Sequence, residues 1–267
     1  MTTLKELMNL RERRVLITGA TGHLGKVMAE TLAELGADLI LVDRPGSEFD
    51  AIEKCLTQSW PVSVECKATD LEIQAERTTL IKSLLDGNGR LDVLINNAGF
   101  TGTSDLQGWG GRLEAQSVET WRRAIEVNLT AAFHLCQGLM PLLSSSGNGS
   151  IVNVASIYGV LGPDWSLYAG TSMTNPAAYA ASKGGLIQLT RWLATTAAPG
   201  VRANSISPGG IARGQPRQFV DRYVARTPLA RMATEDDFRG AIAYLASDLS
   251  NYVTGQDLLV DGGWSAW

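Results

Sequence analysis

Apolar residues in this chain gather in short, nearly continuous runs that alternate with longer segments of helical periodicity. Runs of this kind, rich in Val, Ile and Leu, are typical of strands that are buried on both faces of a parallel sheet. Seven strands are predicted, at 14–18, 38–43, 62–66, 91–96, 150–155, 201–206 and 256–260. Helices are predicted near 24–35, 71–85, 120–143, 177–197 and 234–247. The pattern predicts an α/β fold, with helices on both faces of one parallel sheet of about seven strands.

Two long segments interrupt this alternation. Residues 100–117 and 157–176 are rich in Gly, Ser and Thr, with aromatic residues between them, and each follows the carboxyl end of a predicted strand. Ligands of open α/β sheets bind at that edge, and long loops in compact domains usually serve function. We therefore expect both segments to border a binding site. No internal repeat or low-complexity linker is found, so residues 1–267 are predicted to form one domain.

Composition narrows the possible functions. Apolar residues make up 45% of the 267 residues and the net charge is −4, without a basic run. This balance suits a globular core and gives no reason to expect nucleic acid as a partner. No apolar run has membrane-spanning length, and three scattered cysteines indicate a reducing compartment, so we expect a cytoplasmic protein. Because the chain has only two histidines, we expect no metal site.

A glycine-rich turn joins the first predicted strand to the first helix. Gly19, Gly22 and Gly25 lie in TGATGHLG, where glycine lets backbone N–H groups approach a pyrophosphate at the helix N-terminus. The second strand ends in Asp43, 18 residues beyond Gly25. A carboxylate there accepts the ribose hydroxyls of NAD and repels the additional phosphate of NADP. The sheet is therefore predicted to be a Rossmann-type, doubly wound one with NAD as cofactor; NADP is the alternative, because Arg44 could bind that phosphate.

Tyr179 and Lys183 lie four residues apart in a predicted helix, and so on one of its faces. At about 4 Å and an effective dielectric of about 20, a phenolate and an ammonium attract by roughly 4 kcal/mol. Lys183 is therefore expected to lower the pKa of Tyr179 from about 10 towards neutrality. A phenol with such a pKa is a general acid/base. Taken alone, the pair could equally be a tyrosine and a lysine packed on a helix surface.

Seven short segments follow one another along the chain, most of them after the end of a predicted strand. They are the glycine turn at 18–25, Asp70-Leu71, Asn96-Asn97-Ala98-Gly99, Asn128, Ser156, Tyr179 with Lys183, and Pro208-Gly209. In this order they resemble the short-chain dehydrogenase/reductase family, over nearly the whole chain. The resemblance implies a short, single-domain member that moves hydride between NAD and a secondary alcohol or ketone.

The resemblance also implies roles for the matched residues. Lys183 would hold the nicotinamide ribose, and Ser156 would hydrogen-bond the substrate oxygen, with which Tyr179 exchanges a proton. Asn128 would hold a water that connects Lys183 to solvent. The alternatives are a strand-end cap for Ser156 and a helix-interior polar group for Asn128. The implied cofactor-binding set is Gly19, Thr21, His23, Leu24, Asp43, Asp70, Leu71, Asn97, Ala98, Gly99, Tyr179, Lys183, Pro208, Gly209 and Ile211.

Three departures from the family pattern are present. The glycine turn reads TGxxGxxG instead of TGxxxGxG, with His23 where short members usually carry glycine. This spacing resembles the larger sugar-nucleotide epimerases and dehydratases, and His23 would either contact a phosphate or pack over the turn. Arg213 replaces a threonine that often contacts the nicotinamide amide. Ser156 and Tyr179 are 23 residues apart, more than is usual, and the additional residues fall within 157–176.

The loops beside the expected substrate site are rich in hydroxyl, amide and aromatic side chains, which suits a sugar-like or polyol substrate. The pocket candidates are Thr101, Trp165, Tyr168, Thr171, Ser172, Met173 and Asn175. Arg213, Gln215 and Arg217 lie in a further segment, 212–232, where the family carries a mobile lid. Their guanidinium groups would either pair with a carboxylate or phosphate or remain solvated.

Assembly and two other functions complete the expectations. By resemblance we expect a homotetramer or homodimer. We expect Trp264 and Trp267 to pack on a neighbouring subunit or over its pocket, because two exposed indoles would be unusual. The glycine spacing leaves open an epimerase or dehydratase that retains its NAD. A non-catalytic dinucleotide sensor is the other alternative, against which the complete set of catalytic residues argues.

Overall fold

The computed structural model describes residues 1–87, 89–101 and 106–267. Its centre is a parallel sheet of seven strands in the order β3-β2-β1-β4-β5-β6-β7. The strands are β1 (Arg14–Thr18), β2 (Asp38–Asp43), β3 (Val64–Ala68), β4 (Val93–Asn96), β5 (Gly149–Val154), β6 (Val201–Pro208) and β7 (Asp257–Val260). The seven-stranded, Rossmann-type doubly wound sheet predicted from the apolar runs is therefore confirmed.

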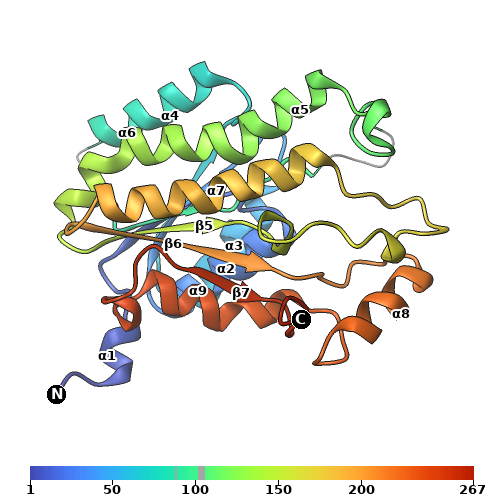
Figure 1. Cartoon of the computed structure of the whole chain (residues 1–267). Helices are drawn as coiled ribbons and strands as arrows, with labels where there is room; N and C mark the ends of the chain where they lie inside the picture. Colours follow the sequence, from blue (N-terminus) through green and yellow to red (C-terminus); the bar gives the residue numbers. More distant parts are fainter. Residues whose placement is uncertain (88, 102–105) are drawn as a thin grey trace.

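Helices cover both faces of the sheet (Figure 1). On one face lie α2 (His23–Glu34), α3 (Phe49–Ser59) and α9 (Arg239–Ala246); on the other lie α4 (Gln74–Asp86), α6 (Ala131–Ser145) and α7 (Ala177–Thr196). Successive strand side chains point to opposite faces. Val15 and Ile17 of β1 therefore pack in the core beneath α2, whereas Leu16 packs in the core beneath α4 and α6.

Several helices differ from the sequence-based prediction. The single helix predicted over 120–143 is α5 (Val118–Ile125) and α6, joined by a π-helical turn at Glu126–Thr130. The short α1 (Leu4–Met8), α3 and α8 (Arg217–Arg226) were not predicted. In α8, the aromatic side chains of Phe219 and Tyr223 are buried at i and i+4 against the neighbouring loop, a spacing that places them on one helix face.

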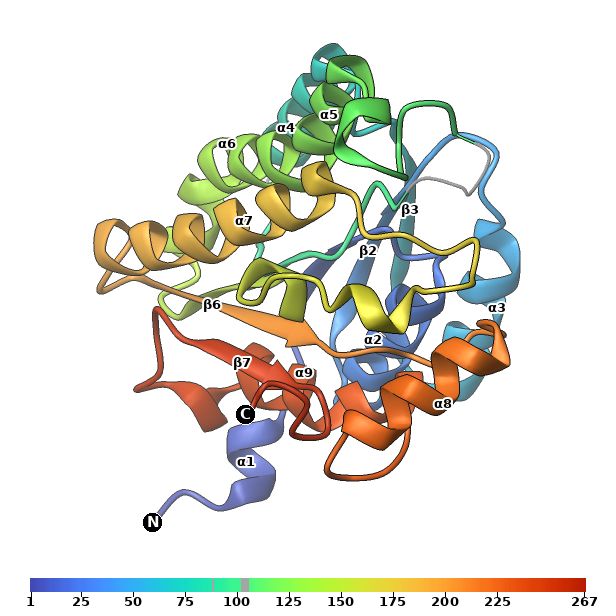
Figure 2. The same cartoon turned by 45° about the vertical axis from the view of Figure 1, so that its right-hand side comes forward.

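The long loops gather at the carboxyl edge of the sheet. Figure 2 shows α8 and the chain before α7 beyond the carboxyl end of β6. The turn at Trp165–Leu167, within the predicted loop 157–176, contacts α8. Residues 102–105 of the predicted loop 100–117 lie outside the described residues. The strand order thus brings the ends of β1, β4, β5 and β6 together at the place where the sequence predicted a site.

Candidate active site

The glycine turn between β1 and α2 is shaped for close backbone approach. Gly19 has φ +64°, and a Cβ on Gly25 would lie only 2.1 Å from the carbonyl oxygen of Gly19. Gly22 precedes α2, whose first turn has no side-chain cap. The N–H groups of that turn are therefore free to bind an anion, which fits the pyrophosphate of a dinucleotide. His23 is the exposed first residue of α2, so both alternatives for its side chain, contact with a phosphate and packing over the turn, stay predictions.

Asp43 is fixed beside this turn. Its Oδ2 accepts hydrogen bonds from the Thr21 backbone N at 2.9 Å and from the Thr21 hydroxyl at 2.7 Å. Its Oδ1 accepts from the Arg44 backbone N at 2.8 Å. Three donors therefore hold a carboxylate at the carboxyl end of β2, where the ribose of a dinucleotide is expected.

The loop after β3 is supported by a buried arginine that the sequence did not single out. Arg77 is 1% exposed and donates to the Leu71 carbonyl oxygen, to His134 Nδ1 at 3.2 Å and to the Glu126 carboxylate. Burial and the positive charge of Arg77 lower the pKa of His134. Asp70 Oδ1 accepts from the Glu72 backbone N at 2.9 Å. These bonds fix the two residues predicted to meet the adenine.

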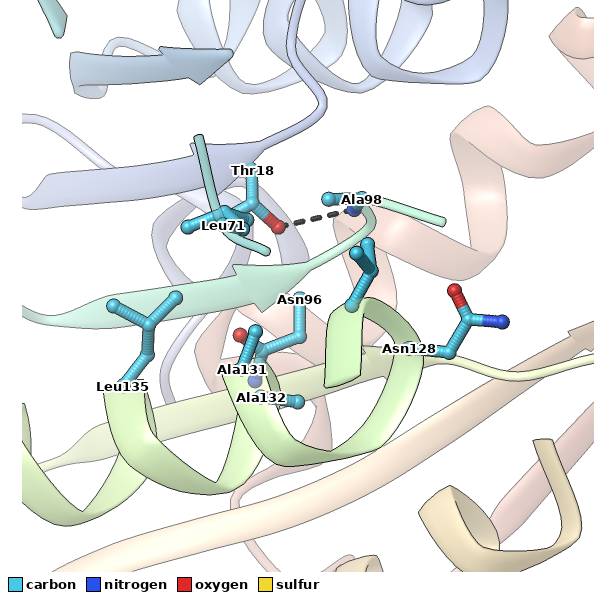
Figure 3. Close-up of a pocket in the computed structure, with 9 residues that line it drawn as sticks. Thr18, Leu71, Asn96, Ala98, Asn128, Ala131, Ala132 and Leu135 are labelled. Carbon is cyan, nitrogen blue, oxygen red and sulfur yellow. Dashed lines mark hydrogen bonds between the residues drawn. The ribbon is translucent and has the colours of Figure 1, made fainter. Parts of the chain in front are cut away.

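The segment 96–99 is tied to the glycine turn. Thr18 Oγ1 accepts hydrogen bonds from the backbone N of Asn97 and of Ala98, both at 3.0 Å. Asn97 Nδ2 donates to the carbonyl oxygens of Thr18 and Gly19. Figure 3 shows the Thr18–Ala98 bond beside a small cavity between this segment and α6. At about 10 Å³ it has the size of one water molecule, so it is not a substrate site.

Tyr179 lies in the first turn of α7, and Lys183 lies one turn further on. Lys183 is 3% exposed, and its Nζ donates to the carbonyl oxygen of Val154 at 2.6 Å. The same Nζ is 5.8 Å from the centre of the Tyr179 ring. Ser156 follows β5 and accepts a hydrogen bond from the Tyr158 backbone N at 3.2 Å. The strand-end cap considered for Ser156 is therefore present, and the hydroxyl proton is still available to a ligand.

Asn128 lies in the π-helical turn and is 1% exposed. Its Oδ1 accepts from the Phe100 backbone N at 2.5 Å, and its Nδ2 donates to Ser182 Oγ at 2.9 Å. A Cβ added to Gly99 would lie 3.8 Å from Lys183 Nζ and 3.9 Å from Asn128 Oδ1. Side chains from two helices therefore converge on Gly99, at the end of the loop predicted to border the cofactor.

The charge state of the pair differs from the prediction. Burial raises the pKa of Tyr179, which the Ser156 side chain and the charge of Arg213 oppose only in part. Burial lowers the pKa of Lys183 to about 8. The prediction that Lys183 lowers the pKa of Tyr179 is wrong, because burial dominates the pKa of the phenol, and the Lys183 amine, 5.8 Å from the ring centre, donates to the Val154 carbonyl instead.

A cavity of about 270 Å³ opens beside Ser156 and Tyr179. Four predicted pocket residues line it, Thr101, Tyr168, Met173 and Asn175, together with Gln215 from the predicted lid segment. The other lining residues are Trp109, Ile157, Tyr158, Thr174, Pro176, Pro208, Gly209, Gly210, Phe219, Tyr223 and Met232. The two aromatic residues of α8 could have been found from their i, i+4 spacing. Tyr158 has no such signal, because the loop around it decides where its side chain lies.

Some predicted pocket residues lie elsewhere. Trp165 is 56% exposed, and Thr171 and Ser172 are not part of the cavity wall. Arg213 Nε pairs with Glu235 at 2.9 Å, and Arg217 pairs with Asp221 on the surface of α8 at 3.7 Å. Burial raises the pKa of Glu235, but the hydrogen bond from Arg213 and the charges of Arg213 and His23 outweigh burial and leave that pKa lowered.

The two C-terminal tryptophans have different surroundings. Trp264 is 1% exposed, its ring centre is 5.7 Å from that of Tyr223, and the Arg226 guanidinium lies 4.3 Å above it. The prediction that Trp264 packs on a neighbouring subunit is therefore wrong, because α8 of the same chain covers it. Trp267 is 74% exposed.

Among the described residues, no group of three or more His, Cys, Asp or Glu side chains could hold a metal ion. Over the same part of the chain, each helix is too short or too polar to cross a membrane.

The fold and these sites define a dinucleotide-dependent oxidoreductase, and comparison with known proteins agrees. A family model described as enoyl-(acyl carrier protein) reductase matches residues 19–265. The 3-oxoacyl-[acyl-carrier-protein] reductase of Thermotoga maritima is 32% identical over 261 residues, which cover 96% of this chain and 99% of that one. A probable galactose dehydrogenase of Rhizobium meliloti is 33% identical over 263 residues, 96% of each chain.

Solved structures give the same result. The NADPH-dependent 3-quinuclidinone reductase of Rhodotorula rubra has a TM-score of 0.88 at 26% identity, covering 100% of this chain and 96% of that one. A short-chain dehydrogenase of Leptospira borgpetersenii with bound NAD⁺ has a TM-score of 0.83 at 33% identity, covering 99% and 96%. The chain belongs to the short-chain dehydrogenase/reductase family. It is an oxidoreductase that acts on CH–OH groups. Solved structures of similar proteins hold NADP or NAD⁺.

Proposed function

We propose that this protein is an NAD(H)-dependent oxidoreductase that interconverts a secondary alcohol and a ketone on a polar, sugar-like or polyol substrate. The main support for this proposal is that Ser156 and Tyr179 line one cavity. The side chains of Lys183 and Asn128 converge on Gly99 behind that cavity. We further propose that residues 1–267 form one domain, with substrate loops near 100–117, 157–176 and 212–232.

The nicotinamide of a bound dinucleotide would supply or accept the hydride. Tyr179 has a raised pKa, so its phenol carries a proton at neutral pH and donates it to the oxygen of a ketone. Ser156 donates a second hydrogen bond to that oxygen. Lys183, positioned by the Val154 carbonyl, would bind the ribose hydroxyls and provide the positive charge that the phenolate requires when the reaction runs towards the ketone.

Support for NAD comes from Asp43. Its carboxylate is held by three donors, so it cannot turn away from a 2′-phosphate without losing them. The acidic group therefore disfavours NADP by charge repulsion. Arg44 follows directly, but its backbone N is one of the donors that fix this carboxylate.

Support for a polar substrate comes from the cavity wall, which combines tyrosine hydroxyls and the Asn175 amide with aromatic rings. Hydroxyl and amide groups bind sugar hydroxyls, and aromatic faces pack on the ring. The name of the Rhizobium meliloti relative, a probable galactose dehydrogenase, is consistent with this substrate class.

We also propose a homotetramer or homodimer. Trp121 on α5, Phe133 on α6 and Trp192 on α7 are 40%, 41% and 54% exposed, and large exposed apolar groups on neighbouring helices mark interaction surfaces. A cytoplasmic location is proposed from the three cysteines, which are all unpaired.

NADH formation at 340 nm tests the function. The purified protein is assayed with NAD or NADP and a panel of sugars, polyols, sugar acids and simple secondary alcohols, beside Tyr179→Phe. We expect turnover with NAD on a sugar-like alcohol and a loss of about 10²–10⁴-fold in the variant. Cofactor binding without turnover on any alcohol would contradict the proposal, and full activity of Tyr179→Phe would contradict the mechanism.

A further inference from the structure

Three polar side chains form one cluster on the wall of the 270 Å³ cavity. The hydroxyl groups of Tyr158 and Tyr168 are 2.5 Å apart and hydrogen-bonded to each other. Asn175, two residues before α7, lies on the same wall, and hydrogen bonding from its side chain opposes the rise in pKa that burial causes in both phenols. All three residues line the same cavity as Ser156 and Tyr179.

Some hydrogen-bonding groups of this cluster have no partner within it. Asn175 is 5% exposed, and among the described residues its Oδ1 has no hydrogen-bond partner. Buried polar atoms without partners are rare in folded proteins, so each requires an explanation. In the Tyr158–Tyr168 pair, one hydroxyl group donates its hydrogen bond to the other, and the second hydroxyl group still has a proton to donate. The cluster thus offers one acceptor and one donor beyond its internal bonds.

A hydroxyl group is complementary to such a site, because it both donates and accepts. A carboxylate or phosphate is not, since it accepts only. The described residues that line the cavity also include no Asp, Glu, Lys, Arg or His, so they offer no charge to pair with an anion. Arg213, whose charge acts on Tyr179, lies outside the cavity wall and is paired with Glu235.

We propose that Tyr158, Tyr168 and Asn175 form a specificity-determining subsite that binds a second hydroxyl group of an uncharged substrate, next to the carbinol held by Ser156 and Tyr179. This inference rests on the proposed function, because it assumes that the reacting carbon lies at Tyr179. It narrows the substrate from polar compounds in general to neutral diols and polyols, and it disfavours sugar acids.

Three alcohols on one ring test the subsite: cyclohexanol, cis-1,2-cyclohexanediol and cis-2-hydroxycyclohexanecarboxylate. They differ only in the group beside the carbinol. Binding of each is measured by calorimetry on the enzyme–NADH complex, where alcohols bind without turnover, for the wild type, Asn175→Leu and Tyr158→Phe. Ser166→Ala is the matched control, because Ser166 lies in the same loop, is exposed and lies outside the cavity wall. Thermal unfolding of each variant verifies its fold.

We expect the wild type to bind the diol at least about tenfold more tightly than cyclohexanol, as one buried neutral hydrogen bond contributes. The carboxylate should bind most weakly. Asn175→Leu and Tyr158→Phe should each weaken diol binding about tenfold and change cyclohexanol binding less than about twofold. Ser166→Ala should keep the wild-type preference.

Equal losses for diol and cyclohexanol, no diol preference in the wild type, or tightest binding of the carboxylate would each overturn the subsite. Turnover of the same alcohols with NAD separates this result from the proposed function. Diol preference without NADH formation would refute the proposed function and support the subsite. NADH formation without diol preference would support the proposed function and refute the subsite.

Discussion

Burial of the Lys183 amine destabilises the folded protein, and replacing Lys183 should make this loss of stability measurable. The side chain is 3% exposed, and burial lowers its pKa to about 8. Methionine has a similar length and no charge. We expect Lys183→Met to abolish turnover and to remove a pH-dependent loss of stability from the cofactor-free protein.

The magnitude follows from the pKa. A fall from 10.5 to about 8, at about 1.4 kcal/mol per unit, corresponds to roughly 3 kcal/mol. Below pH 8 the amine is protonated in both states, so the folded protein bears the full cost. Between pH 8 and 10.5 the unfolded chain binds one more proton than the folded one, so wild-type stability rises with pH and the cost disappears. Loss of the bond to Val154 offsets about 1.5–3 kcal/mol of the gain in the variant. Any dependence of this bond on the charge of the amine is already contained in the pKa of Lys183, so it leaves the pH-dependent part unchanged.

Urea unfolding of both proteins without cofactor, at intervals from pH 7 to 10.5, measures this. The stability of Lys183→Met relative to the wild type should fall by roughly 3 kcal/mol across that range, because contributions of other groups cancel in the difference. Lys5→Met, at an exposed position of α1, should show a constant difference. A constant difference for Lys183→Met as well would refute the reasoning.

Three further changes test other parts of the site. Gly25→Ala places a methyl group 2.1 Å from the Gly19 carbonyl oxygen and should abolish NADH binding, measured by fluorescence. Gly240→Ala, which has open space around it in α9, is the control and should keep NADH binding and raise the free energy of unfolding by up to about 1 kcal/mol. Equal NADH binding by the two variants would contradict the argument that the backbone approaches closely at Gly25. Asp43→Asn should reduce the ratio of kcat/KM for NAD over NADP by about tenfold or more, and an unchanged ratio would remove Asp43 from cofactor selection. Trp192→Glu should lower the oligomeric mass in light scattering, and an unchanged mass would exclude this face from the interface.

The sheet could be predicted from sequence because strands buried on both faces leave continuous apolar runs, as at 38–43 and 201–206. The atypical glycine spacing has a local explanation in the structure. Gly22 occupies the position before α2, and the side chain of His23 is exposed. A residue larger than glycine is therefore accommodated at position 23 while Gly25 keeps the close approach to Gly19.

The rest of the site depends on packing that no local pattern records. The charge of Lys183 was predicted to set the pKa of Tyr179, but burial is the largest cause of the pKa shift in both groups. Trp264 was expected to face a partner, but α8, which was predicted as loop, covers it. The hydroxyl contact between Tyr158 and Tyr168 joins residues ten apart across an irregular loop, and loop geometry is not encoded in hydrophobic periodicity.

The strand order has a consequence for how such a gene can change. Because β4 is the central strand of the sheet and the chain crosses from β3 over to it, the residues proposed to bind the adenosine end precede position 100, while those around the substrate cavity follow it. A crossover between related genes near this point would exchange substrate preference and retain the adenosine-binding half. The pair β4 and β5, which meets along Val93–Asn96 and Ser150–Asn153, is the boundary between the two halves, and both parents of such a recombinant would have to match there.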